Sequence, residues 1–530
     1  MPNSLSDNVA RLRAAKTAIG NAIVKRGGEI GENDGLEDFP QAILDIPKTG
    51  YEHGGVNFFD LDGIILHSFT SEEFLKLTEM PENPDHTYEW LVAQGWNWTL
   101  ADAKAYVAKY GALNIGQHYT TPDDKTAIDV HLPEGCLNPQ LGLFVNGSVR
   151  VEWGDGTEDT LTNTGMKYTY ATHQYAEPGQ YYILLTVTGS AEIKSTNGAN
   201  VFFCKGGKGT GKPGNESKAY SNCITDVHLG ANIDIGKFAF YRCYSMKHIS
   251  IPSTVRSINE SSFRWDSTLE SIVIPHGVTE LGANTFEGCY GMRFLSVPNT
   301  LESIGDRCFA ECYSLICATF PETMTSIGSS AFADNPSCDV LLTPGADNIP
   351  FEFVIRNRTM AAFSIPEGIT TLGDYAFAYA YGLKDITLPS TLLSAGASCF
   401  SDCQALNTIS IPNTFTTLGE SMFNNCTALQ QVNIPSSVTA IPSKCFRQCY
   451  SMSKIEIPAS IETIAAEAFT TCSGLGIIKF LGSTPPTVAN ANAFTSLEYS
   501  CKILVPEGSL ADYTSAQNYP DPTKYTYEEY

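Results

Sequence analysis

The sequence lacks several features that would point to particular partners. No uninterrupted apolar run in its 530 residues approaches the roughly 20 residues that span a bilayer, so we expect no membrane insertion. Basic residues are few, with 33 Lys and Arg against 57 Asp and Glu and a net charge of −24. Because phosphate binding depends on Lys and Arg, this balance argues against a nucleic-acid partner. The apolar fraction of 43% is nevertheless ordinary for a folded globular protein.

Signatures of catalysis and of metal binding are also missing. The sequence shows no recognisable Ser/His/Asp, Cys/His or paired-carboxylate constellation and no CxxC pair. The Gly- and Lys-rich segment 201–222, which we interpret as a linker or loop, lacks phosphate-loop spacing because Lys212 is followed by Pro213. We therefore expect a protein that is not an enzyme and has no catalytic residue, no cofactor and no metal.

One short motif with catalytic potential needs separate treatment. Residues 58–65 contain Asp60 and Asp62 and resemble the first motif of haloacid-dehalogenase-type phosphatases, in which these would be nucleophile and acid/base. Only about 60 residues follow before the next predicted domain, too few for the Rossmann-like sheet of that family. We interpret the motif as a turn between strands.

The main positive signal is an internal repeat. Ten prolines each follow a short apolar alternation, spaced by 23 residues except for one step of 22: Pro252, Pro275, Pro298, Pro321, Pro344, Pro366, Pro389, Pro412, Pro435 and Pro458. The alternation predicts a short strand with one buried face, and proline ends it because it cannot donate to a strand ladder. The Phe-x-x-Cys segment suits a short helical turn whose Phe enters the core. One repeat cannot bury both of its faces, so the repeats must stack into a solenoid.

This pattern resembles the BspA-type leucine-rich repeat, which implies parallel short strands on one face and helical or irregular turns on the other. The resemblance covers residues 223–506, and residues 507–530 look like a terminal cap and tail. The block from Pro344 to Ile365 departs from the pattern. We expect a kink or surface loop there, with a specialised binding element as the alternative.

The 16 cysteines of the chain follow the repeat. Seven of them occupy the same repeat position: Cys243, Cys289, Cys312, Cys403, Cys426, Cys449 and Cys472. In a solenoid these residues stack about 4.8 Å apart, and bridging every rung would strain the backbone. Free cysteine packs well as a small buried apolar residue. We expect a column of buried thiols, with disulfides as the weaker alternative.

Two further modules precede the solenoid. Residues 123–200 contain Trp-Gly-Asp-Gly-Thr157, His173-Gln-Tyr and a Pro-Gly-x-Tyr strand, and they resemble a PKD-type β-sandwich. Asp155 could bind calcium there, but we favour a turn-capping role for it. Residues 51–122 suggest a small mixed α/β module with a Trp-rich core and a helix over 100–110. The chain is thus predicted to be multi-domain and mainly β.

The first 50 residues suggest an attachment segment. Leu5, Val9, Leu12, Ile19 and Ile23 form one helical stripe, compatible with a short coiled coil and a homotrimer. The segment resembles the N-terminal attachment segment of tail and minor structural proteins in phages of Gram-positive hosts. That resemblance implies other virion proteins as partners. The alternative is an amphipathic helix packed on the next domain.

These features support two hypotheses about function. The first is a phage tail fibre or receptor-binding appendage, located on the virion after assembly in the host cytoplasm, whose solenoid attaches to a host surface protein or glycan. The alternative is a BspA-repeat adhesin on the bacterial cell surface. Such an adhesin should carry a signal peptide and a wall anchor, and we see neither, which favours the first hypothesis.

Two sets of residues are candidates for binding on the solenoid. Tyrosines recur directly after the cysteine position, where each could meet a ligand or cap its own turn: Tyr244, Tyr290, Tyr313, Tyr381 and Tyr450. Small polar residues occupy the predicted outward strand positions and would form a flat hydrogen-bonding ladder: Ser250, Ser296, Thr319, Thr387, Ser410 and Asn433.

Overall fold

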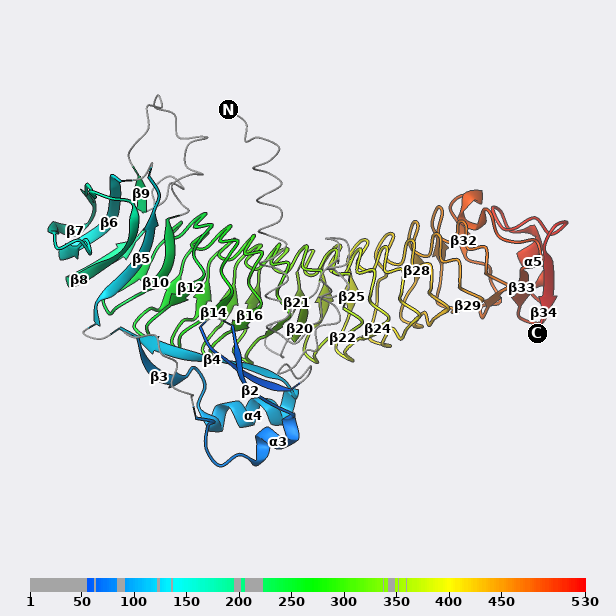
Figure 1. The fold of residues 1–530 in the computed structure, drawn as a ribbon. Helices are drawn as coiled ribbons and strands as arrows, with labels where there is room; N and C mark the ends of the chain where they lie inside the picture. The colour runs from blue at the N-terminus through cyan, green and yellow to red at the C-terminus, as the bar shows by residue number, and fades with distance from the viewer. Residues whose placement is uncertain are drawn as a thin grey trace, which may run out of the picture.

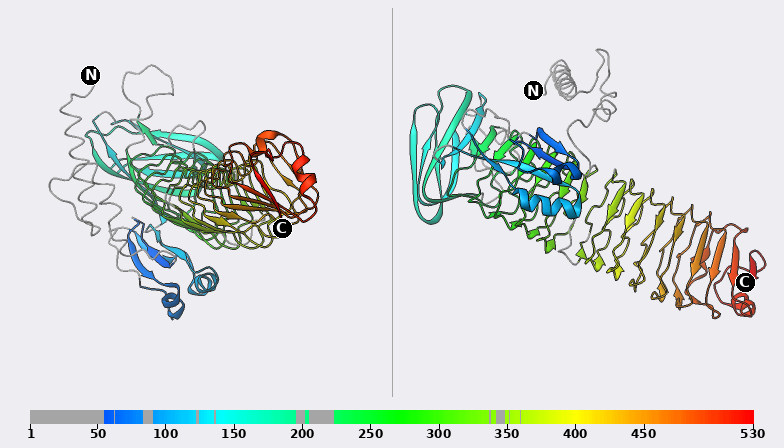
Figure 2. Two further views of the ribbon diagram at one scale, coloured as in Figure 1. Left: turned by 90° about the vertical axis from the view of Figure 1, so that its right-hand side faces the viewer. Right: turned by 90° about the horizontal axis from the view of Figure 1, so that it is seen from below.

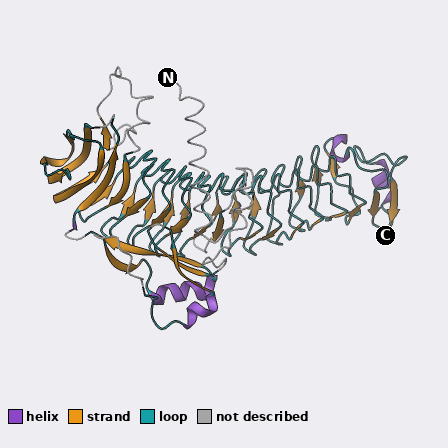
Figure 3. Cartoon of the chain, viewed as in Figure 1, coloured by secondary structure: helices purple, strands orange, loops and turns teal. Residues whose placement is uncertain are grey.

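The computed structural model describes residues 55–61, 63–82, 91–121, 124–134, 137–194, 202–204, 223–336, 338–341, 348–350, 352–358 and 360–530. The predicted attachment segment 1–50 and most of the linker 201–222 lie outside these residues. The chain forms an elongated solenoid with a sheet at one end and a small module on one side (Figure 1). Strands and loops dominate, and helices are few and short (Figure 3). Within the described part of the chain, no helix has the length and apolar character to cross a membrane.

One long side of the solenoid, here called the wide face, carries the strand that precedes each proline. Neighbouring strands run parallel and keep the repeat register, so that Ile272 pairs with Leu295. Its strands are β10 (Ile224–His228), β12 (His248–Ser250), β14 (Ser271–Val273), β16 (Phe294–Ser296), β18 (Cys317–Thr319), β20 (Asp339–Leu341), β22 (Ala362–Ser364), β24 (Asp385–Thr387), β26 (Thr408–Ile409), β27 (Gln431–Val432), β29 (Lys454–Ile457), β31 (Ile477–Phe480) and β33 (Lys502–Val505).

A second side, the narrow face, carries shorter parallel strands in which one residue points into the core. Ile258 pairs with Leu281, and both are buried. Its strands are β11 (Ile233–Ile235), β13 (Ser257–Ile258), β15 (Glu280–Leu281), β17 (Ser303–Ile304), β19 (Ser326–Ile327), β21 (Asn348–Ile349), β23 (Thr371–Leu372), β25 (Ser394–Ala395), β28 (Ala440–Ile441), β30 (Thr463–Ile464) and β32 (Thr487–Val488).

The third side consists of the Phe-x-x-Cys segments, which form turns and not the helical turns we predicted. Two residues per repeat adopt left-handed backbone conformations, for example Ser398 (φ 54°) and Asp402 (φ 62°). The N–H of Phe400, between them, donates to the carbonyl of Met422 in the next repeat at 3.0 Å. In a helix that N–H would bond within its own turn. The turn side therefore adds a third hydrogen-bonded column between repeats.

The phenylalanines of these turns fill the centre of the solenoid as a stack of rings. Phe400 and Phe423 lie 5.7 Å apart with an interplanar angle of 9°, and Phe423 and Phe446 lie 5.6 Å apart with an angle of 8°. Each ring covers one face of the next, so a ring in the middle of the array is fully buried. The predicted core position of this residue is confirmed.

The seven column cysteines are buried free thiols, as predicted. The Sγ of Cys426 donates to the carbonyl of Phe400 at 3.1 Å, and the Sγ of Cys449 donates to that of Phe423 at 3.2 Å. Burial raises the pKa of Cys426 well above its ordinary value. The column is thus a ladder of side chains that hydrogen-bond one repeat to the previous one.

The block between Pro344 and Ile365 keeps the repeat in its described residues. β21 pairs with β23 in register, and Phe353 is buried in the core. Asn357 occupies the cysteine position and its amide donates to the carbonyl of Cys338 at 2.9 Å. The ring geometry also changes here: Phe353 meets Phe332 at 78° and Phe377 at 73°, in place of the near-parallel stacking of the other repeats. The predicted loop or binding element, if it lies in 342–347, falls outside the described residues.

The sheet at the N-terminal end closes the solenoid. It comprises β5 (Thr126–Leu132), β6 (Pro139–Glu152), β7 (Glu158–Thr172), β8 (Gly179–Ile193) and β9 (Phe202–Cys204). β5 pairs with β10 of the wide face and β8 pairs with β11 of the narrow face. Unpaired edge strands invite association with other chains. Because β10 and β11, the first strands of the two faces, are paired in this way, neither has an exposed edge. The strands predicted as a separate sandwich are therefore continuous with the solenoid sheets, in one sheet of 12 strands.

The motif residues of that sheet bind one another. His173 Nε2 contacts Asp155 Oδ2 at 2.7 Å, and the imidazole stacks on Trp153 with ring centroids 4.9 Å apart. Asp155 Oδ1 accepts the N–H of Thr157 at 3.0 Å, and Tyr175 donates to the carbonyl of Trp153 at 2.7 Å. Asp155 therefore caps the turn, the role we favoured over calcium binding.

The small module lies beside the solenoid (Figure 1). Its four-stranded sheet has the order β2 (Ile65–Phe69), β1 (Val56–Phe59), β4 (Leu113–Thr120), β3 (Val92–Trp96), with helices α3 (Ser71–Lys76) and α4 (Leu100–Tyr110). The predicted helix over 100–110 is confirmed; Thr99 caps its start and Gly111 (φ 82°) ends it. Asp60 lies in the turn between β1 and β2, where its N–H donates to the carbonyl of Ile64 at 3.0 Å. Its carboxylate accepts the hydroxyl of Tyr119 and the N–H of Leu61.

The C-terminal end is closed by the last residues of the chain. β34 (Thr526–Glu529) pairs in parallel with β33, and the short helix α5 (Leu510–Ser515) follows that strand. The side chain of Tyr513 is fully buried and its hydroxyl donates to the carbonyl of Gly482 at 2.7 Å. A 3-10 helix, η4 (Ala491–Phe494), places Phe494 at the end of the ring stack. These residues act as the cap expected for 507–530.

Candidate binding surfaces

The small module covers the wide face over strands β14, β16 and β18, as two views of the chain show (Figures 1 and 2). Phe59 stacks on Phe294 with ring centroids 5.4 Å apart. The hydroxyl of Ser296 donates to the carbonyl of Asn114 at 2.8 Å and accepts an N–H of the Asn97 amide at 2.7 Å. The module thus occupies the outward side chains of these strands.

Because the module lies over this part of the wide face, three of the six residues predicted to form an exposed polar ladder are not exposed. Ser250, Ser296 and Thr319 are 3%, 0% and 3% exposed, because the module or neighbouring side chains lie over them. The equivalent residues further along the solenoid, Thr387, Ser410 and Asn433, are exposed as predicted. The wide face is therefore divided into a covered half and an open half, and only the open half can meet a partner.

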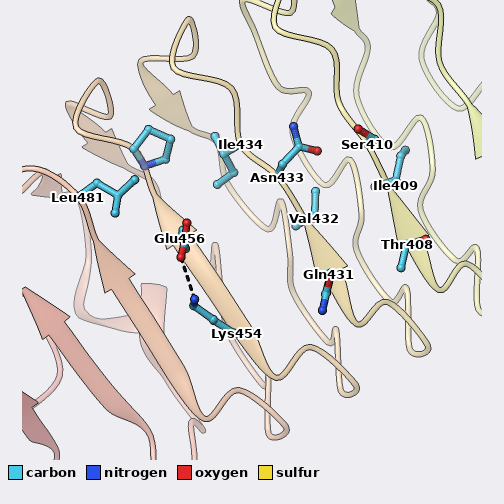
Figure 4. A pocket seen from close by; sticks show the side chains of 11 residues that line it. Thr408, Ile409, Ser410, Gln431, Val432, Asn433, Ile434, Lys454, Glu456 and Leu481 are labelled. Carbon is cyan, nitrogen blue, oxygen red and sulfur yellow. Dashed lines mark ion pairs between the residues drawn. The ribbon is translucent and has the colours of Figure 1, made fainter. Parts of the chain in front are cut away.

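The open half contains a hollow of about 660 Å³ (Figure 4). Its lining residues come from four successive strands and the segments that follow them: Thr408, Ile409, Ser410, Gln431, Val432, Asn433, Ile434, Lys454, Glu456, Pro458 and Leu481. The ammonium of Lys454 lies 2.8 Å from the carboxylate of Glu456, and this hydrogen bond lowers the pKa of Glu456. Leu481 is 41% exposed, an apolar side chain on a polar surface. The hollow can therefore combine an apolar contact with polar ones.

The side chain of Asn433, which lines this hollow, hydrogen-bonds the main chain of the previous repeat. Its amide Nδ2 donates to the carbonyl of Ile411 at 2.7 Å, and its Oδ1 accepts the N–H of the same residue at 2.8 Å. The side chain replaces main-chain bonds between two repeats, and strands β26 and β27 are only two residues long there. Asn433 is exposed, but its hydrogen-bonding groups are partly used by the fold.

The predicted tyrosines lie on the turn side, away from the wide face. Tyr290, Tyr313, Tyr381 and Tyr450 are between 36% and 47% exposed, and Tyr244 is half-buried. The rings of Tyr290 and Tyr313 stack 5.0 Å apart at 15°. The structure therefore brings these two together, whereas Tyr381 and Tyr450 stand three repeats apart. Whether the tyrosines bind a ligand stays a prediction.

Sequence reasoning missed a neighbouring cluster of aromatic and basic residues on the same side. The guanidinium carbons of Arg242 and Arg264 lie 4.4 and 4.6 Å from the ring centroid of Trp265. Arg264 and Arg307 both contact the carboxylate of Glu287, at 2.7 and 2.9 Å. Arg242 and Trp265 are one repeat apart in the sequence, so the 23-residue period could have predicted their contact.

A second cleft lies between the module and the solenoid. It is lined by the rings of Trp96 and Trp98 and by the polar side chains of His118, His276 and Asn299. Burial, with a smaller contribution from the nearby His276, lowers the pKa of His118 to about 4. This imidazole is therefore neutral at physiological pH.

Comparison with solved structures finds other leucine-rich repeat proteins. A leucine-rich repeat protein from Bacteroides ovatus is 24% identical, with a TM-score of 0.42, over 58% of this chain and 94% of that one. One from Eubacterium ventriosum is 25% identical, with a TM-score of 0.37, over 51% and 74%. The pneumococcal vaccine antigen PcpA is 16% identical, with a TM-score of 0.40, over 66% and 85%. No curated protein matches the sequence.

The sequence of the solenoid also matches a family model. Residues 216–345 and 351–476 match the BspA type leucine-rich repeat region, in six copies. The two ranges are separated only by residues 346–350, so nearly all of the block from Pro344 to Ile365 is matched as well. Over these residues the solenoid is thus similar to the BspA type leucine-rich repeat region.

Proposed function

We propose that the chain is a non-enzymatic adhesion protein of a bacterial cell surface that binds a host protein or glycan through the open half of its wide face. The observation that carries the proposal is the division of that face in a solenoid of BspA-type repeats. The module covers the part of the face around strands β14, β16 and β18, whereas the open half presents exposed residues of strands β22 to β31.

The character of the open half suits recognition of an extended partner. Each repeat contributes outward polar residues, such as Thr387 and Gln431, at a regular spacing of about one strand separation. Such surfaces on solenoids bind by many modest contacts over a long distance. The hollow at Glu456 adds a recess in which a protruding group of the partner could be buried.

Attachment of variants to host cells tests the proposal. The double variant T408R/Q431R places two bulky cations on the open half and should abolish attachment of the purified full chain to host epithelial cells. The matched control A440R/T463R carries the same change on exposed residues of the narrow face and should attach normally. Equal attachment by both variants, with unchanged circular dichroism, would refute binding through the wide face.

A second candidate is the phage receptor-binding protein suggested by residues 1–50. Its support is the helical stripe and the resemblance of that segment to phage attachment segments, and these residues lie outside the described structure. Immunogold labelling with antibodies against the chain separates the two candidates, since label on virions favours the phage protein and label on intact bacteria favours the adhesin. Mass measurement with and without residues 1–50 tests the predicted trimer, which a monomer in both cases would contradict.

A further inference from the structure

The repeat prolines leave a row of main-chain carbonyls without their usual donors. In a parallel ladder, one residue bonds to two residues of the next strand that flank its partner. On the wide face, the N–H of Ile365 donates to the carbonyl of Thr387, 22 residues later, and the carbonyl of Ile457 accepts the N–H of Leu481, 24 residues later. In other repeats the position of Leu481 is proline, which has no N–H. The carbonyl of the residue 24 positions before each such proline therefore needs another donor.

Aromatic side chains supply that donor at three of these positions. Trp98 Nε1 donates to the carbonyl of Val297 at 2.9 Å, and Tyr106 donates to that of Phe320 at 2.8 Å. At the C-terminal end, Tyr530 donates to the carbonyl of Phe480 at 3.0 Å. Two segments far apart in the sequence, α4 with its preceding residues and the C-terminal end, thus use the same kind of group, an aromatic ring with a polar tip, at the same repeat position.

The open half contains the same position without such a partner. Residue 458 lies 24 positions after Ile434, the spacing at which Leu481 donates to Ile457, but it is proline and has no N–H. No other described residue donates to the Ile434 carbonyl. Ile434, Pro458 and Leu481 line the hollow, whose rim carries Asn433 and Glu456 (Figure 4). The preceding carbonyl, of Ile411, differs because Asn433 already donates to it. The hollow therefore offers an unsatisfied acceptor beside an apolar wall.

We propose that this hollow binds a protein segment that presents a tryptophan or tyrosine side chain, whose N–H or O–H donates to the carbonyl of Ile434 while its ring lies against Pro458 and Leu481. The proposal rests on the adhesive function and names the class of partner. The open half continues the surface on which Trp98 and Tyr106 already sit, so the covered half provides the geometry of the contact. A glycan hydroxyl could also donate to the carbonyl, but the three internal occupants and the exposed Leu481 favour an aromatic ring.

Restoring the missing N–H is the most direct test. In the full chain, P458L should let residue 458 donate to Ile434 as Leu481 donates to Ile457, without lowering the melting temperature. P435L is the matched control, because the carbonyl of Ile411 already has a donor. The probe is a random dodecapeptide library displayed on particles and panned against the immobilised chain, followed by titration of the enriched peptides.

We expect the enriched peptides to carry Trp or Tyr, to lose about tenfold in affinity when that residue becomes Phe, and to lose about tenfold against P458L. Binding to P435L should stay within about twofold of the unchanged chain. Absence of enrichment, or peptides that bind equally well to P458L, would overturn the proposal. So would loss in P458L of binding to arrayed glycans without any effect on peptides. If T408R/Q431R abolishes cell attachment while P458L changes nothing, this inference fails and the adhesive function stands.

Discussion

The indole Nε1 of Trp98 donates to the carbonyl of Val297 at 2.9 Å, across 199 positions of the chain. This bond joins the small module to the solenoid. The substitution W98F keeps a ring in the interface and removes the donor, which leaves the carbonyl unsatisfied at a cost of about 1–2 kcal/mol. We expect faster hydrogen exchange in strands β14, β16 and β18 of W98F. The control Y381F removes an exposed hydroxyl and should leave exchange unchanged, and equal exchange in all three proteins would contradict the role of the bond.

Asp266 is a buried carboxyl in the cysteine column. It lies one repeat after Cys243 and one before Cys289, and both of its carboxylate oxygens are buried close to the backbone of Cys243. Burial raises the pKa of Asp266 well above its ordinary value, and the backbone of Cys243 opposes this only in part. The equivalent Asn335 shows what a neutral amide does there, because its Nδ2 donates to the carbonyl of Phe309 at 2.7 Å.

The substitution D266N should therefore stabilise the protein, and more so as the pH rises. The raised folded pKa makes the contribution of Asp266 most favourable below the unfolded pKa of about 3.9, and the contribution is lost progressively as the pH rises above that value. We expect a gain of about 2 kcal/mol in urea unfolding at pH 7 and almost none at pH 4. The control D385N, on exposed strand β24, should change little at either pH. A gain of equal size at both pH values would show that Asp266 is not the cause.

The column thiols should be inert in the native protein. Burial raises the pKa of Cys426 and Cys449 well above the ordinary value, and reagents reach only exposed thiolates. Brief iodoacetamide treatment followed by peptide mass analysis should find the seven column cysteines unmodified when folded and fully modified in urea. Stability should also be equal with and without reductant. Rapid native modification of a column cysteine would contradict the packing role.

The sequence predicted the parts of this fold that repeat, and missed those that depend on contact between distant segments. The ring stack at Phe423 and the thiol column at Cys426 follow from the period, because each residue meets its equivalents at a fixed spacing. The burial of Ser296 does not, since the residue that covers it, Asn97, is 199 positions away in an unrelated module. The turn conformation was missed for a different reason: residues such as Asp402 take positive φ values that side-chain patterns do not reveal.

The stacked pair Tyr290 and Tyr313 provides a last test of binding on the turn side. The two rings are 37% and 47% exposed, so the variant Y290A/Y313A removes surface area and one stacking contact without opening the core. Its free energy of unfolding should fall by about 1 kcal/mol at most. If the turn side contributes to adhesion, attachment to host cells weakens several-fold in this variant, and the matched variant Y375A, with one exposed ring elsewhere on the turns, attaches normally. Unchanged attachment with intact circular dichroism would assign these tyrosines to the turns alone and leave the wide face as the binding surface.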